Sequence, residues 1–205
     1  MKKRYVIGLL LIVGGCSLKA QPRKDVAETV ARYDAYVAQA MRDWRVPGLT
    51  VTVVKNGRVL LKKGYGVRQL GRPEPVTTQT LFAMASTTKA MTAACLGMLV
   101  DEGKLNWDDP VTNHLPDFQL YDPAVTRSLR VRDLLLHNTG LGNADVLWTA
   151  MQVPADEVLR RLRFLEPAYP LRAGFVYQNI MYLAAGKVIE HVSGQPWKTF
   201  IRQRL

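Results

Sequence analysis

The 205-residue chain is predicted to have an α+β fold, in which a lobe with an antiparallel sheet and covering helices is joined to an all-helical lobe. Two β-rich runs joined by an Asn-Gly pair lie near the N-terminus, and the later segments follow helical periodicity. Hydrophobic residues make up 48% of the chain and charged residues 22%. This composition is typical of a globular protein and excludes a disordered tail, a collagenous rod and a multi-span membrane protein.

The first predicted elements are a helix and a hairpin. Apolar residues recur every three or four positions over residues 26–44, which is typical of an amphipathic helix that ends at the Pro-Gly pair 47–48. Val- and Thr-rich runs at 49–54 and 59–65 flank Asn-Gly at 56–57. That dipeptide predicts a two-residue hairpin turn, because both of its residues accept positive φ.

This hairpin cannot be a complete sheet. Two strands alone are marginal in water, and both of their edges would be open for pairing. We therefore expect another chain, or a segment that this sequence lacks, to complete the sheet.

Beyond the hairpin the pattern predicts helices separated by loops. Gly103 is expected to end the first of these helices, and Cys95 is expected to pack inertly on its apolar face. Residues 106–123 are predicted to be a loop. The predicted helical segments are 86–102, 129–137, 144–166, 178–192 and 197–205.

The N-terminus has the features of an export signal. Residues 2–4 are basic, residues 5–13 are apolar, and the apolar run is about half as long as a bilayer-spanning helix. Val-Gly-Gly-Cys at 13–16 resembles a bacterial lipoprotein cleavage box, which makes Cys16 the expected lipidation site and 1–15 the signal peptide. Cleavage after Ala20 is the alternative. The expected location is the periplasm or cell envelope, with a lipid anchor to the membrane through Cys16.

The chain is strongly basic, with 28 Lys and Arg against 17 Asp and Glu, a net charge of +11 and a pI near 9.9. These cations are scattered singly and lack interleaved aromatic residues, so we expect a solvated basic surface and no nucleic-acid partner. The three histidines stand far apart without flanking ligands, and the two cysteines cannot build a disulfide scaffold. No metal or other cofactor is expected.

A candidate nucleophile lies in Ser-Thr-Thr-Lys at 86–89. At the start of a helix, positions i and i+3 share a face, so the Lys89 amine can approach the Ser86 hydroxyl. The helix N-terminus favours an oxyanion and an unprotonated lysine, which could then help to remove the serine proton. The alternative is a helix N-cap serine beside a solvated lysine.

A second candidate group is Tyr-Gln-Asn at 177–179, between a predicted loop and a helix. A tyrosine near a lysine ammonium has its phenolate favoured and becomes a plausible base. Asn179 could donate and accept hydrogen bonds to an amide or ester. The alternative is a half-buried core tyrosine followed by a helix-capping asparagine.

Four segments together resemble the serine hydrolases related to class C β-lactamases and DD-peptidases, which include penicillin-binding-protein-like enzymes. The segments occur in the family's order at residues 80–89, 99–111, 131–141 and 175–179. The resemblance runs from about Val26 to Leu205 and implies a β-lactamase/DD-peptidase-like fold.

The resemblance also implies roles for individual residues. Ser86 would be the acylated nucleophile, and its backbone N–H would supply half of the oxyanion hole. Lys89 and Tyr177 would share the work of the general base, and Asn179 would contact the substrate. His137 resembles a structural position near a turn, and no Ser-His-Asp triad is expected because Ser86 lacks the Gly-x-Ser-x-Gly elbow.

The sequence departs from the family at its C-terminal end. Family members continue into antiparallel strands that carry a Lys-Thr-Gly or His-Thr-Gly motif, and neither motif occurs here. We therefore expect an incomplete domain over residues 22–205, with a helical lobe at about 105–172 and the C-terminal strands missing.

Two functions remain open. The first is an exported serine hydrolase that forms an acyl-enzyme on a β-lactam, a D-Ala peptide of the peptidoglycan type or a small ester. The second is a catalytically silent remnant or envelope-binding module that keeps the scaffold. The sequence does not determine the acyl substrate or the oligomeric state.

Overall fold

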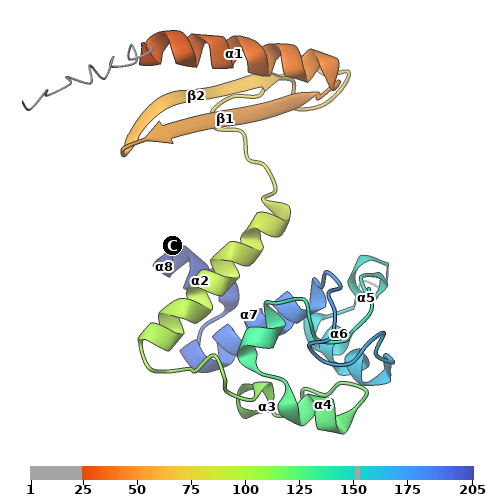
Figure 1. Cartoon of the computed structure of the whole chain (residues 1–205). Helices are drawn as coiled ribbons and strands as arrows, with labels where there is room; N and C mark the ends of the chain where they lie inside the picture. Colours follow the sequence, from red (N-terminus) through yellow and green to blue (C-terminus); the bar gives the residue numbers. More distant parts are fainter. Residues whose placement is uncertain (1–24, 151–152) are drawn as a thin grey trace, which may run out of the picture. The chain divides into compact units, whose positions relative to one another are not determined.

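The computed structural model describes residues 25–150 and 153–205 (Figure 1). The predicted signal peptide and Cys16 lie outside the described residues. The chain divides into two compact units, the first ending at Phe82 and the second running from Ala83 to Leu205. Among the described residues, no helix is both long and apolar enough to cross a bilayer.

The first unit is a helix lying along a hairpin (Figure 1). Helix α1 (Val26–Asp43) is followed by strands β1 (Gly48–Lys55) and β2 (Arg58–Gly66), which pair antiparallel. The turn residues Asn56 and Gly57 have φ of 49° and 72°. The predicted helix, hairpin and turn are therefore confirmed.

A polar contact joins α1 to β2 in this unit. The Asp34 carboxylate accepts hydrogen bonds from the Lys63 ammonium at 2.8 Å and from the Tyr65 hydroxyl at 2.7 Å. Lys63 first, and Tyr65 second, hold the pKa of Asp34 below its ordinary value. Burial, followed by the bond to Asp34, raises the pKa of Tyr65 to about 12. This contact fixes α1 against the strand that it covers.

The second unit is built around two helices, α2 (Thr88–Asp101) and α7 (Ile180–Ser193), which pack against each other. Both supply fully buried residues to one core, among them Leu96 and Leu99 from α2 and Val188 from α7. Cys95 is also buried there, as predicted. Gly103, with φ of 68°, follows the C-terminal end of α2. The remaining elements are η1 (Ala85–Thr87), α3 (Val111–His114), α4 (Pro123–Ser128), η2 (Val131–Leu134), α5 (Val146–Thr149), α6 (Ala155–Arg161), η3 (Leu162–Phe164) and α8 (Trp197–Arg204).

Several predicted boundaries in this unit were wrong. The segment expected to be helical over 144–166 is divided, because Pro154 has an extended backbone and starts α6 as its N-cap. Residues 129–137 form only the short turn η2. The predicted loop 106–123 contains α3, and α4 begins at Pro123, where the Asp122 carboxylate accepts from the Ala124 N–H.

A buried carboxylate anchors the loop that leads into α7. Asp133 is 1% exposed and receives two hydrogen bonds from the Arg172 guanidinium, at 3.0 and 2.6 Å. The Asp133 carboxylate also accepts a hydrogen bond from the Arg130 backbone N–H at 2.9 Å. The bond with Asp133 raises the pKa of Arg172. This ion pair ties the stretch before Tyr177 to η2.

Candidate active site

Ser86 lies on the short turn η1, directly before α2. The preceding residue, Ala85, has φ of 46°, in the left-handed region that non-glycine residues seldom adopt. Such backbone strain is concentrated at functional sites. The predicted helix over 86–102 begins two residues later than expected, so Ser86 and Lys89 face each other across the junction of turn and helix.

Three predicted site residues meet at the Ser86 hydroxyl oxygen. The Lys89 amine donates to it at 3.2 Å, and the Tyr177 hydroxyl donates to it at 2.6 Å. The Lys89 nitrogen also lies 4.7 Å from the centre of the Tyr177 ring. The spacing of Ser86 and Lys89 predicted the first contact, whereas the fold supplies the second across 91 residues of sequence.

The surroundings of Tyr177 favour its ionised form. Its pKa lies below the ordinary value, first because of its interaction with Lys89 and second because of its hydrogen bond with Ser86. Burial and the negative charge of Asp145 act in the opposite direction but are outweighed. A phenolate here would accept the Ser86 proton, which reverses the direction of their hydrogen bond.

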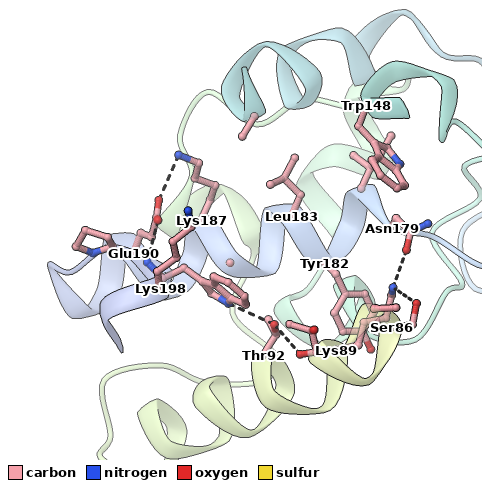
Figure 2. A pocket seen from close by; sticks show the side chains of 17 residues that line it. Ser86, Lys89, Thr92, Trp148, Asn179, Tyr182, Leu183, Lys187, Glu190 and Lys198 are labelled. Carbon is pink, nitrogen blue, oxygen red and sulfur yellow. Dashed lines mark hydrogen bonds and ion pairs between the residues drawn. The ribbon is translucent and has the colours of Figure 1, made fainter. Parts of the chain in front are cut away.

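Asn179 completes the group, and it occupies the N-cap position of α7. Its side-chain oxygen accepts from the Lys89 amine at 2.6 Å (Figure 2), and its side chain makes no capping bond to α7. Its amide nitrogen donates to both carboxylate oxygens of Asp145 at 3.0 Å. Asp145 therefore fixes which end of the Asn179 amide faces Lys89.

Asp145 and Trp148 are site residues that the sequence reading missed. The Trp148 indole N–H donates to Asp145 at 2.9 Å, so one carboxylate holds both side chains. Tyr182 was also missed, and its ring centre lies 5.3 Å from the Lys89 nitrogen. No local motif marks these residues.

A cavity of about 790 Å³ opens beside Ser86, between α2, α7 and α8. Figure 2 shows Ser86, Lys89 and Asn179 at one end of it and Lys187, Glu190 and Lys198 toward the other. Leu183, Trp148 and Trp197 give much of the lining an apolar character. A mostly apolar cavity with a few convergent polar groups is the usual form of a small-molecule site.

Among the described residues, no group of three or more His, Cys, Asp or Glu side chains is placed to hold a metal ion. The predicted candidates Ser86, Lys89, Tyr177 and Asn179 all meet at one place. His137 stacks on the Tyr177 ring, with the ring centres 4.6 Å apart.

The chain is similar in sequence to a known protein family and to proteins of that kind. The sequence profile of the β-lactamase family matches residues 33–205. The unguisins hydrolase ungD of Aspergillus violaceofuscus is 31% identical over 191 residues, covering 89% of this chain and 34% of that protein. Protein flp of Staphylococcus aureus is 27% identical over 171 residues, covering 82% of this chain and 34% of that protein.

The fold of the chain is also similar to those of solved structures. The octameric penicillin-binding protein homologue from Pyrococcus abyssi superposes with a TM-score of 0.75 and 27% identity, over 86% of this chain and 42% of that one. The D-amino acid amidase from Ochrobactrum anthropi SV3 superposes with a TM-score of 0.70 and 25% identity, over 83% and 47%. The chain thus spans about a third of the length of these curated relatives and less than half of these structures.

Proposed function

The chain belongs to the β-lactamase family, and from that premise we propose that it is a serine hydrolase that forms an acyl-enzyme on an amide or ester. One observation carries the proposal. The Ser86 hydroxyl lies within hydrogen-bond distance of both the Tyr177 phenol and the Lys89 amine. A nucleophile in contact with a base that a third group orients is the arrangement that activates serine in acyl transfer.

In the acylation step the Ser86 oxygen attacks the substrate carbonyl carbon while its proton passes to the Tyr177 phenolate. Lys89 holds that phenolate by its positive charge and keeps the Ser86 oxygen in place. The carbonyl π electrons move onto oxygen and form a tetrahedral oxyanion. The Ser86 backbone N–H is expected to be one of its donors.

Collapse of this intermediate breaks the bond to the leaving amine or alcohol. The leaving group takes the proton held by Tyr177, which restores the phenolate. A water molecule then attacks the acyl-serine carbonyl, gives its proton to Tyr177, and releases the carboxylic acid as Ser86 regains its proton. Every proton borrowed by Tyr177 is therefore returned.

The lining of the cavity favours a substrate that carries an apolar acyl or amine group next to the bond that is broken. Trp148 and Leu183 lie along it, and Asn179 stands beside Lys89 at its reactive end (Figure 2). The name of one similar structure points to amide chemistry, because that protein is a D-amino acid amidase. We therefore favour an amide or peptide substrate and retain β-lactams and small esters as candidates.

The alternative is a catalytically silent binding module that keeps the scaffold. No contact among the described residues favours it over the hydrolase. The two differ in turnover, because a module would bind substrate without releasing a product.

Hydrolysis assays separate the two functions. The purified protein is given a chromogenic cephalosporin, a D-alanine anilide and a nitrophenyl ester, beside the variants Ser86→Ala and Ser128→Ala. Ser128 lies on α4 and donates to the Val125 carbonyl, so its variant serves as the matched control. We expect Ser86→Ala to lower kcat/KM by about 10⁴ or more on any hydrolysed substrate while Ser128→Ala leaves it unchanged. A folded wild type that turns over none of them would contradict the proposal.

We further propose that the protein is exported and anchored to the cell envelope through a lipid on Cys16. The proposal rests on the basic and apolar N-terminal segment followed by Val-Gly-Gly-Cys at 13–16. Fractionation of a bacterial host should find the wild type in the membrane and a Cys16→Ser variant outside it. Recovery of both proteins in the cytoplasm would contradict export.

A further inference from the structure

His137 occupies a strained backbone position beside the proposed base. Its φ of 58° is left-handed, and its ring is half-buried among Phe175, Tyr177 and Tyr182. The ring lies nearly parallel to that of Tyr177, with an interplanar angle of 30° and a centroid distance of 4.6 Å. It therefore packs against one face of the Tyr177 ring.

The same residue binds the backbone on both sides of Tyr177. The Val176 N–H donates to the His137 carbonyl oxygen at 3.0 Å, and the Gln178 N–H donates to His137 Nδ1 at 2.9 Å. Tyr177 itself precedes α7, which begins at Ile180, so no helical ladder holds its backbone. Two hydrogen bonds and one ring contact from a single residue thus define the place of this loop tyrosine.

We propose that His137 is a positioning residue that holds the Tyr177 hydroxyl on Ser86 through its Nδ1 acceptor. The inference rests on the proposed function, because it concerns the geometry of that base. A phenol at the end of a side chain converts a small backbone shift into a displacement of about 1 Å. Such a displacement can cost about 100-fold in rate.

The contact also fixes the protonation state that supports activity. A nitrogen that accepts the Gln178 N–H carries no proton, so the neutral ring has its proton on Nε2. Protonation of Nδ1 would set two N–H donors against each other and break the bond. Burial first, and the positive charge of Lys89 second, lower the pKa of His137. The bond is therefore intact at neutral pH and is lost only as the pH falls through that lowered value.

The groups that face His137 come from three sides. Lys89 lies on α2, Tyr182 lies on α7, and Tyr177 lies on the loop that precedes α7. The Tyr169 hydroxyl donates to the His137 carbonyl at 3.2 Å. Lys89 is the charged side chain in this set that acts on the pKa of His137.

Two variants test whether His137 acts through its hydrogen-bond acceptor or only through the volume of its side chain. In His137→Asn the side-chain oxygen takes the place of Nδ1, and asparagine tolerates positive φ. In His137→Gln the acceptor is moved one bond further out. We expect His137→Asn to keep kcat/KM within about fivefold and His137→Gln to lower it by about 30-fold, within the range that a misplaced group can cost. Tyr169→Phe removes a neighbouring bond and leaves Nδ1 untouched, so it serves as the control with little effect.

The pH profile and a direct titration complete the test. In the wild type, kcat/KM should fall at low pH as His137 is protonated. This fall should be absent in His137→Asn. The Tyr177 phenol, followed by NMR of ring-labelled tyrosine, should keep its lowered pKa in His137→Asn and return toward its ordinary value in His137→Gln. Equal losses in the two variants with unchanged phenol titrations would overturn the positioning role. If the wild type has no activity, the proposed function fails, and the phenol titrations alone decide whether His137 positions Tyr177.

Discussion

The hydroxyl oxygen of Tyr177 lies 2.6 Å from that of Ser86, although 91 residues separate them in the sequence. The contact requires the loop before α7 to reach the turn before α2. Packing of α2 on α7 and the Asp133–Arg172 ion pair bring these two segments together. A tyrosine held at this distance by the fold itself is ready to accept a proton from serine.

Removal of the Tyr177 hydroxyl should disable the chemistry and leave the fold intact. Tyr177→Phe keeps the ring that stacks on His137, so we expect the same Tm as the wild type. We expect kcat/KM to fall by about 10² to 10⁴, the usual contribution of a general base. Tyr121→Phe, at an exposed tyrosine, is the control. Full activity in Tyr177→Phe would assign the base role elsewhere.

Lys89 should control the ionisation of Tyr177. A nearby positive charge favours the phenolate and lowers its pKa, so Lys89→Met should move the Tyr177 titration to higher pH. The change is read from the ultraviolet difference between each protein and its Tyr177→Phe counterpart. Lys62→Met, an exposed lysine on β2, should have no effect. An unchanged titration in Lys89→Met would mean that Lys89 does not act on this phenol.

Asp145 should act through Asn179. Without the carboxylate, the Asn179 amide is free to turn its nitrogen toward Lys89, and we expect Asp145→Ala to lower kcat/KM by about tenfold. Since Asn179→Ala already removes that amide, adding Asp145→Ala should cost little more. A double-mutant cycle should give a coupling of about 0.5–3 kcal/mol, the range found for residues in one network. Strict additivity would mean that the two residues contribute independently.

The Asp133–Arg172 pair should matter more for stability than the other ion pairs of this unit. Arg172→Met leaves a carboxylate that is 1% exposed with only the Arg130 N–H as partner. The Arg172 side chain is 47% exposed, so we expect a loss of about 2 kcal/mol in the free energy of unfolding, below the range for a wholly buried pair. Urea denaturation measures it. Arg132→Met, which breaks an exposed pair with Asp108, should cost about 0.5 kcal/mol or less. Equal losses in the two variants would contradict the anchoring role.

Local patterns predicted much of this molecule. Helical spacing located α1, the Asn-Gly turn located the hairpin, and the i, i+3 spacing located the contact of Ser86 with Lys89. The Tyr-Gln-Asn motif made Tyr177 and Asn179 candidates, and the resemblance to the family implied their roles. In each case neighbouring residues or a short motif carried the information.

The missed features depend on tertiary contacts. Asp145 reaches Asn179 across 34 residues, and no spacing rule connects them. Short elements such as α3 have too few residues for periodicity to show, and Pro154 divided a segment whose apolar pattern looked continuous. His137 was predicted to be structural, and only its hydrogen bond to the Gln178 N–H, 41 residues away, suggests a wider role.

Covalent capture of the nucleophile tests the central claim most directly. The protein is treated with a fluorescent penicillin or a fluorophosphonate, its intact mass is measured, and the modified peptide is sequenced. The proposed mechanism predicts one adduct per chain on Ser86, none in Ser86→Ala, and slower labelling in Tyr177→Phe. A folded wild type that remains unlabelled by both reagents, or an adduct on another residue with Ser86 untouched, would contradict it.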